Sequence, residues 1–456
     1  MLTYIDSHVR SFCSDTRAGA AVIFALAALP ILTAIGCAID YSRAAQLHSK
    51  LQAAIDCASV GSVAKTSPAF IAAGSMSSSG PIPAGVTDAL NIFNANMSGV
   101  TGYNLNSVTA VVALASGTVT STIQFSANIP TLFLGLIGVN TITVTGLSVA
   151  TANMPLYVDF YLLLDNSPSM SVGATPSDVA TMVSATSASS LGGYQNCAFA
   201  CHDVAVGATD NFYALAKSLG VTMRIDVLRT ATQQLMTTAA QTETYSNQFR
   251  MAIYDFGSSA DSAAITTIFP LSSSLTSAQT AAGNIDVMTV NGQGDQGDQD
   301  TDFDNLLTQM NKLIGSPGSG TSSAPEKYLF FVSDGVADEN NAACLYTMTN
   351  STIGNIAPRC QEPINTALCT TIKNRGIKIA VLYTTYLALP TNAWYNAWIA
   401  PFNAGPWGPS PNSQIAINMQ SCASPGLYFE VSPTQGISEA MSALFQKAVA
   451  DAHISN

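Results

Sequence analysis

The segment 157–164 is an almost uninterrupted apolar run that ends at Asp165. A strand with one face in water alternates apolar and polar residues, whereas a strand buried on both faces of a parallel sheet does not. A second run of this kind, 326–332, is followed closely by Asp334. Other strand and helix patterns alternate through the same region, at 224–240, 249–256, 377–383, 427–431 and 435–450. Residues 153–456 are therefore predicted to form an α/β domain with a doubly wound, mainly parallel sheet.

Oxygen-bearing side chains follow both apolar runs. Asp165, Ser167 and Ser169 put one carboxylate and two hydroxyls on a single loop, and Asp334 ends the later strand. Thr301 lies between them, in a segment rich in glycine and aspartate that leads into a predicted helix. Parallel strands bring their carboxyl ends to one sheet edge, and Mg²⁺ or Mn²⁺ prefers such oxygen ligands. The alternative is that the two aspartates cap the helices that follow them.

These three pieces, in this order, resemble the metal-ion-dependent adhesion site (MIDAS) of von Willebrand factor A domains. The resemblance implies that Ser167, Ser169 and Thr301 bind the metal through their hydroxyls. It implies that Asp165 and Asp334 bind mainly through water. The open coordination position would accept a carboxylate from a partner protein, which is binding without catalysis.

A calcium loop is a second possibility for the aspartates near Thr301. Asp298, Asp300, Asp302 and Asp304 imitate the spacing of an EF-hand, which keeps Ca²⁺ as an alternative cation. Phe303 stands where that loop requires glycine.

The composition excludes one class of partner. The chain has a net charge of −12, only 10% charged residues and no basic cluster, so nucleic acid is not expected. The mean hydropathy of +0.28 is high for a free cytosolic protein.

The N-terminal region contains an uncharged run long enough to cross a bilayer. We expect a short cytoplasmic segment at 1–17, a transmembrane helix at 18–40 and a helical extension at 41–66. A cleaved secretory peptide is the alternative. Lysines and arginines are balanced on the two sides of the run, so the positive-inside rule does not orient it.

Cysteines provide the orientation instead. An even number in the C-terminal part predicts disulfides and an oxidising compartment. The six are Cys197, Cys201, Cys344, Cys360, Cys369 and Cys422. Cys197 and Cys201 are expected to form a local pair, in preference to a haem or zinc site with His202.

The segments 17–26, 38–43 and 51–56 together resemble the N-terminus of TadE/TadG-like proteins of the bacterial Tad (Flp) pilus system. The resemblance implies a single-pass inner-membrane protein with a periplasmic C-terminal domain, or one that reaches the cell surface, with pilus and secretion components as partners. Phe24 stands where prepilin-type segments carry glutamate, so prepilin processing is not expected.

Residues 67–152 are predicted to hold a linker, at 67–83, and a small pilin-like β module. Its antiparallel strands are expected at 107–112, 118–125 and 141–149. The apolar segment 132–137 is expected to be a buried link, with a membrane-touching loop as the alternative.

Two segments, 171–222 and 386–413, are insertions relative to a minimal A domain. The second contains Trp394, Trp398 and Trp407 and follows the carboxyl end of a strand. Aromatic residues there form either a partner surface beside the metal or a helix face packed on the sheet.

An enzyme is not expected. The chain lacks the G-x-S-x-G, P-loop and H-E-x-x-H patterns, and His202 is the only histidine inside the globular part. A hydrolase using Asp165 and Asp334 around a metal, or an A-domain adhesin unrelated to pili, are the alternatives.

Overall fold

The computed structural model describes residues 18–76, 78–115, 117–188, 195–200, 202–203, 211–262, 264–290, 301–340, 344–346, 359–385, 388–390, 392–393, 395–404, 413–432 and 436–454. The chain divides into two compact units, Met1–Met154 and Pro155–Asn456, which are described separately.

The first unit contains one very long helix, α2 (Ala18–Ser62). It unites the predicted span and most of the predicted extension, with Pro30 inside it. In the described part of the chain it is the one helix long and apolar enough to cross a membrane. Large side chains from Val22 to Ile39 are exposed, which fits a segment surrounded by lipid.

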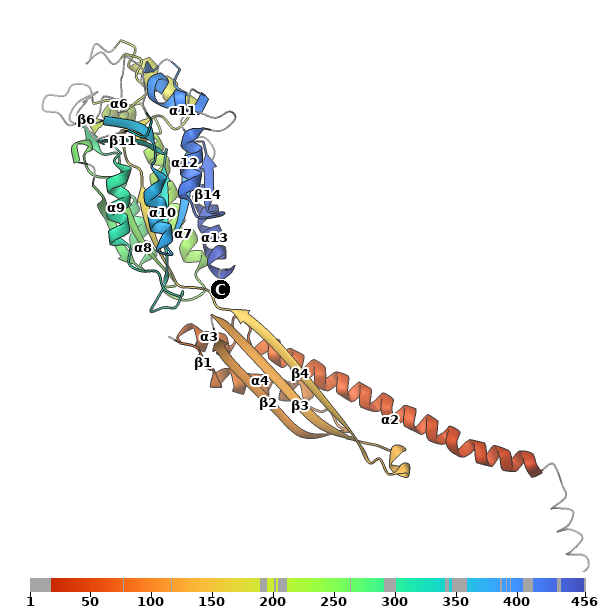
Figure 1. Cartoon of the computed structure of the whole chain (residues 1–456). Helices are drawn as coiled ribbons and strands as arrows, with labels where there is room; N and C mark the ends of the chain where they lie inside the picture. Colours follow the sequence, from red (N-terminus) through yellow and green to blue (C-terminus); the bar gives the residue numbers. More distant parts are fainter. Residues whose placement is uncertain are drawn as a thin grey trace, which may run out of the picture. The chain divides into compact units, whose positions relative to one another are not determined.

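A four-stranded antiparallel sheet packs against the second half of α2 (Figure 1). Its order is β1-β2-β3-β4, with bounds Gly80–Pro81, Asn104–Ala115, Thr118–Pro130 and Thr141–Asn153. Ile123 and Phe125 of β3 are buried, as are Leu51 and Ile55 of α2. The predicted antiparallel β module is therefore confirmed.

The predicted linker at 67–83 is wrong. It contains α3 (Pro68–Gly74), and α4 (Pro83–Met97) begins at its end. Ser67 caps α3, because its Oγ accepts a hydrogen bond from the backbone N–H of Phe70 at 3.2 Å. Proline occupies a first-turn position in both helices, where its missing N–H costs nothing.

The expected burial of 132–137 is also wrong. This segment forms the tip of the β3–β4 hairpin and includes a short 3₁₀ helix, η1 (Leu134–Ile137). Leu136 is 83% exposed, and Leu132 and Ile137 are exposed as well.

The second unit is built on a six-stranded sheet with the order β14-β13-β10-β5-β7-β8. All neighbouring pairs are parallel except β7 with β8. In chain order the strands are β5 (Val158–Leu164), β7 (Phe249–Asp255), β8 (Thr266–Ser272), β10 (Glu326–Ser333), β13 (Lys378–Thr384) and β14 (Tyr428–Val431). The predicted doubly wound, mainly parallel α/β fold is confirmed.

Helices cover both faces of this sheet. One face packs against α7 (Arg224–Thr242), α8 (Leu275–Ala282) and α13 (Ile437–Ile454). The other packs against α9 (Phe303–Leu313), α10 (Thr366–Asn374) and α12 (Gln414–Cys422). Alternate residues of β5 enter the two cores, which explains why its sequence is continuously apolar.

Shorter elements surround the carboxyl edge of the sheet (Figure 1). They are η2 (Pro168–Ser171), α5 (Pro176–Ala185), β6 (His202–Asp203), α6 (Phe212–Ser218), η3 (Ala260–Ser262), β9 (Thr289–Val290), β11 (Val336–Asn340), β12 (Arg359–Pro363), the π-helical turn η4 (Tyr395–Ile399) and α11 (Ala400–Ala404). β11 pairs with β12 antiparallel, and β6 pairs with β9 parallel.

Candidate metal centre

Two aspartates leave neighbouring strands at the carboxyl edge of the sheet. β5 and β10 are parallel, with Leu164 level with Val332. The backbone N–H of Asp165 donates to the carbonyl of Val332 at 3.0 Å, which continues the pairing one residue beyond β5. Asp334 follows β10 directly. Strand register therefore places both carboxylates at one edge, as the sequence predicted.

The Asp165 loop turns its hydroxyls toward the carboxylate. Oδ1 of Asp165 accepts from the backbone N–H of Ser167 at 2.9 Å and from its Oγ at 2.6 Å. Oδ2 accepts from Oγ of Ser333 at 2.6 Å. The hydroxyls of Ser167 and Ser169 are 2.9 Å apart. One carboxylate and two serine hydroxyls thus form a single hydrogen-bonded group, in which Asp165 and Ser167 are buried and Ser169 is half-buried.

Asp334 is paired with a buried arginine that sequence reasoning missed. Nη1 of Arg224, at the start of α7, lies 3.3 Å from Oδ2 of Asp334, and both side chains are 1% exposed. Nη2 of Arg224 donates to the carbonyl and to Oγ1 of Thr384 at 2.9 and 2.8 Å. Oδ1 of Asp334 is buried and has no hydrogen-bond partner among the described residues. A buried carboxylate oxygen is costly to leave unpaired, so this atom indicates room for a further ligand.

The electrostatics of the pair favour a cation. Burial, reinforced by the negative charge of Asp334, raises the pKa of the Asp165 carboxyl to about 6. A positive charge near these two buried carboxylates would offset the repulsion between them. Within the described residues no three His, Cys, Asp or Glu side chains are grouped as metal ligands. A cation here would therefore need hydroxyl oxygens as well, which suits Mg²⁺ or Mn²⁺.

Thr301 is positioned by its backbone. Its N–H donates to the carbonyl of Asp338 at 3.1 Å, and the N–H of Asp338 donates back at 3.0 Å. Asp338 belongs to β11, which begins two residues after Asp334. Thr301 is buried and precedes α9. Its assignment as the third-loop ligand remains a prediction.

The calcium-loop alternative receives no support from the aspartates that can be placed. Asp298 and Asp300 lie outside the described residues. Oδ1 of Asp302 caps α9 by accepting the backbone N–H of Asn305 at 2.8 Å. The backbone N–H of Asp304 donates to Oε2 of Glu339 at 3.4 Å. Asp302 therefore acts as a helix cap, which accounts for its position without a metal.

Asn166 holds the Asp165 loop against the neighbouring strand. Its Nδ2 donates to the carbonyls of Gly257 and Asp286 at 2.8 and 3.2 Å, and its Oδ1 accepts from the N–H of Phe256 at 3.1 Å. These contacts fix the backbone that presents the serine hydroxyls. Nothing in the sequence distinguishes Asn166 from an ordinary loop residue.

The predicted tryptophan surface is not supported. Trp398 is 4% exposed and belongs to the core that covers one face of the sheet. The alternative, a helix face packed on the sheet, therefore applies to this residue. Trp394 and Trp407 lie outside the described residues.

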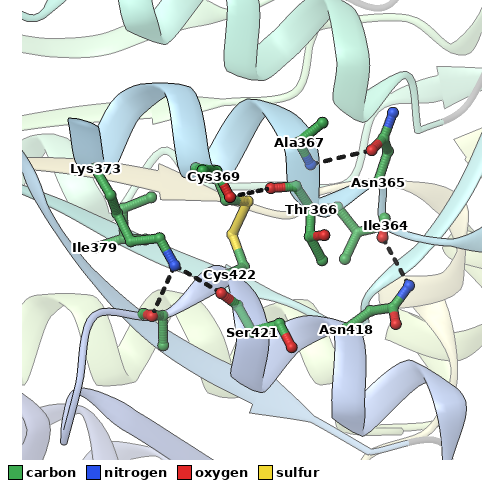
Figure 2. The surroundings of a disulfide bond; sticks show 12 residues. Ile364, Asn365, Thr366, Ala367, Cys369, Lys373, Ile379, Asn418, Ser421 and Cys422 are labelled. Atoms are coloured by element: carbon green, nitrogen blue, oxygen red, sulfur yellow. Dashed lines mark hydrogen bonds between the residues drawn. A yellow bond between two sulfur atoms is a disulfide. The ribbon is translucent and has the colours of Figure 1, made fainter. Parts of the chain in front are cut away.

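Disulfides join four of the six cysteines expected to form bridges. Cys344 pairs with Cys360, and Cys369 pairs with Cys422. Figure 2 shows the second bond between α10 and α12, where Nζ of Lys373 also donates to the carbonyl of Ser421 at 2.7 Å.

Cys197 differs from its expectation. Its thiol is free and buried, and Sγ donates to the carbonyl of Phe199 at 3.5 Å. The expected partner, Cys201, lies outside the described residues.

Comparison with known proteins adds a family match at the N-terminus. The family model described as "Putative Flp pilus-assembly TadE/G-like" matches residues 19–64, which confirms the predicted TadE/G-like character of this segment. No curated protein matches the chain.

Two solved structures illustrate what the chain is similar to. One is the vWF domain of the type V pili tip protein Mfa5 from Porphyromonas gingivalis, with 9% identity, 66% of this chain and 98% of that chain covered, and a TM-score of 0.36. The other is proximal thread matrix protein 1 from the mussel byssus, with a zinc-occupied MIDAS motif. Its identity is 10%, the coverage is 64% of this chain and 48% of that chain, and the TM-score is 0.32.

Proposed function

We propose that this chain is a membrane-anchored protein of the Tad (Flp) pilus system that binds partner proteins through a divalent cation. The single observation behind the cation site is Asp334, whose buried Oδ1 has no hydrogen-bond partner in the described region. It directly follows β10, the strand next to the one that presents Asp165 and the hydroxyls of Ser167 and Ser169.

Each side chain would have a distinct role toward the cation. Ser167, Ser169 and Thr301 would offer hydroxyl oxygens, and the two carboxylates would bind it mainly through water. When bound, the cation supplies a positive charge with an open position for a carboxylate of the partner. The residues of this chain would orient that position, so the outcome would be attachment without a chemical step.

Three features support the proposed location. Residues 19–64 match a pilus-assembly family, and α2 is long and apolar enough to be a single membrane span. The disulfides Cys344–Cys360 and Cys369–Cys422 favour an oxidising compartment for the second unit. We therefore assign this unit to the periplasmic side of the inner membrane.

Calorimetric titration of Mg²⁺ and Mn²⁺ into the full-length chain in detergent tests the site. We expect saturable binding that weakens by about 10–100-fold in Asp334→Asn, Ser169→Ala and Thr301→Ala. Asp255→Asn is the matched control, since Asp255 ends the adjacent strand β7 at the same edge and is also buried. Equal affinity in all variants would refute the assignment, and loss in Asp255→Asn as well would indicate a nonspecific charge effect.

The pilus role needs a cellular test. In cells lacking this chain, wild-type and Asp255→Asn copies should restore surface pili or attachment, and Asp334→Asn should not, at equal membrane levels. If Asp334→Asn restores surface pili or attachment fully, the cation site is not needed for the pilus role.

A further inference from the structure

Among the described residues outside the first half of α2, the tip of the β3–β4 hairpin gathers several exposed large apolar side chains. Its large side chains project from residues 132–139, and the exposed members are Leu132, Phe133, Leu136, Ile137 and Val139. Soluble surfaces rarely gather such a group at one loop. Such a group of side chains is expected to be covered by another apolar surface. The contacts of the tip with α2 indicate that this surface is the lipid bilayer.

Asp40 fixes the tip to the helix. Its Oδ1 accepts the backbone N–H of Leu132 at 2.9 Å, and its Oδ2 accepts those of Phe133 and Leu134 at 2.8 Å each. Asp40 is only 2% exposed. Three charge-assisted hydrogen bonds to one carboxylate hold the loop firmly in place.

Phe133 also packs over a glycine of the helix. A Cβ added to Gly36 would lie 2.5 Å from Cβ of Phe133, so only glycine permits this close approach. Gly36 is one turn before Asp40, about 6 Å further into the apolar run. Asp40 is the first charged residue after that run. The tip therefore lies at the level where the predicted span leaves the hydrocarbon.

Most backbone N–H groups of the tip are hydrogen-bonded, as an apolar environment requires. Besides the three N–H groups held by Asp40, those of Leu136, Gly138 and Val139 donate to carbonyls within the tip at 3.0–3.1 Å. Thr131 closes the base of the loop, since its N–H donates to Asn140 and its Oγ1 to Val139. Unpaired backbone groups are excluded from lipid, and here most are paired.

We propose that this tip is a second membrane contact, which inserts its apolar side chains among the lipid acyl chains at the interface where α2 leaves the bilayer. It would bury them at the headgroup–acyl boundary, as interfacial elements do. Together with α2 it would hold the β module against the membrane by two points, which restrains tilting of that module. The proposal rests on the membrane anchor of the proposed function and not on the cation site.

Tryptophan fluorescence of the full-length chain in phosphatidylcholine vesicles tests it, with lipids brominated on the acyl chain near the headgroup as quenchers. Leu136→Trp places the reporter on the tip. Leu26→Trp, within the span, is the positive control. Val149→Trp is the matched negative control, because Val149 is exposed and apolar on the same sheet but about 27 Å along β4 from its tip end.

We expect the brominated lipids to remove most of the added emission of Leu136→Trp and little of that of Val149→Trp. Quenching at Leu26 without quenching at Leu136 would overturn the tip proposal alone. No quenching at Leu26 would refute the anchor and the tip together. A blue shift at Leu136 without quenching would show that a protein surface, including a second copy, covers the tip, which also overturns the proposal.

Asp40→Asn then tests the attachment. Removing its charge should reduce quenching at Leu136 without changing quenching at Leu26. Asp56→Asn, an exposed aspartate on the same helix, should change neither. Unchanged quenching at Leu136 in Asp40→Asn would show that Asp40 does not hold the tip at the membrane.

Discussion

Replacing Arg224 with methionine isolates the charge balance of the candidate metal centre. The methionine retains much of the apolar volume, but it leaves Asp334 buried without the guanidinium that lies 3.3 Å away. Removing one partner of a buried ion pair costs about 3–5 kcal/mol, chiefly because the remaining charge is uncompensated. At roughly 2–4 °C per kcal/mol, we expect the thermal midpoint of the cation-free protein to fall by about 6–20 °C.

Lys217→Met is the matched control, since Lys217 pairs with Asp226 while 40% of its side chain is exposed. An exposed pair contributes about 0–1 kcal/mol, so this variant should melt within a few degrees of the wild type. The double variant Arg224→Met with Asp334→Asn should recover stability, because the stranded charge is gone. Mg²⁺ should stabilise Arg224→Met more than the wild type.

Differential scanning calorimetry of the full-length chain, with and without EDTA, measures all of these midpoints. If the thermal midpoint of Arg224→Met equals that of the wild type, the ion pair contributes nothing to stability. The claim that an unpaired buried Asp334 is costly would then be refuted. If the double variant is no more stable than Arg224→Met alone, lost packing and not the stranded carboxylate explains the effect.

Four further predictions concern the pH dependence of the site, one disulfide and the packing of the first unit. Because the pKa of Asp165 is raised to about 6, protons compete with the cation, and calorimetric Mg²⁺ affinity should fall about tenfold between pH 7.5 and 5. Without a cation, the contribution of this raised pKa to stability is fully present below pH 3.8 and is lost as pH rises through about 6, which urea unfolding across that range checks. Replacing Cys369 and Cys422 together by serine opens a link across 53 residues and should cost about 2–4 kcal/mol in urea unfolding. Gly85→Ala should destabilise the first unit by about 1–3 kcal/mol in thermal unfolding, since its Cβ would lie 2.6 Å from Cβ of Ala69 and 2.7 Å from Cγ1 of Val112.

The central strands of the second unit could be predicted because a strand buried on both faces is continuously apolar, and this pattern is visible in the strand's own sequence. The runs ending at Asp165 and Asp334 needed no knowledge of their neighbours. The parallel arrangement then brings both to one edge. Arg224 was not predictable, because its partner lies 110 residues away and a helix-starting arginine is ordinarily exposed.

The first unit shows a different limit. Ser67 followed by Pro68 is a recognisable helix start, but the surrounding serine, glycine and proline content favoured a linker. The tip at 132–137 has the composition of a core segment, and its exposure depends on Asp40, a residue 92 positions earlier than Leu132. Local patterns predicted the strands well. They missed α3, where two local signals conflicted, and they failed at the tip, where one distant polar side chain decides which surface the segment faces.

Charge counting at the candidate metal centre gives Arg224 a role in the proposed function beyond stability. Two carboxylates and one guanidinium leave one excess negative charge in a buried site, which repels a partner's carboxylate. Under the proposed function, a divalent cation would reverse the sign, so the same site would then attract that carboxylate and reach neutrality on binding it. Without Arg224 the cation alone would neutralise Asp165 and Asp334, and an arriving carboxylate would be buried with no charge to compensate it. Loss of Arg224 should therefore tighten the cation and weaken the partner, which makes the arginine the residue that ties partner binding to the cation.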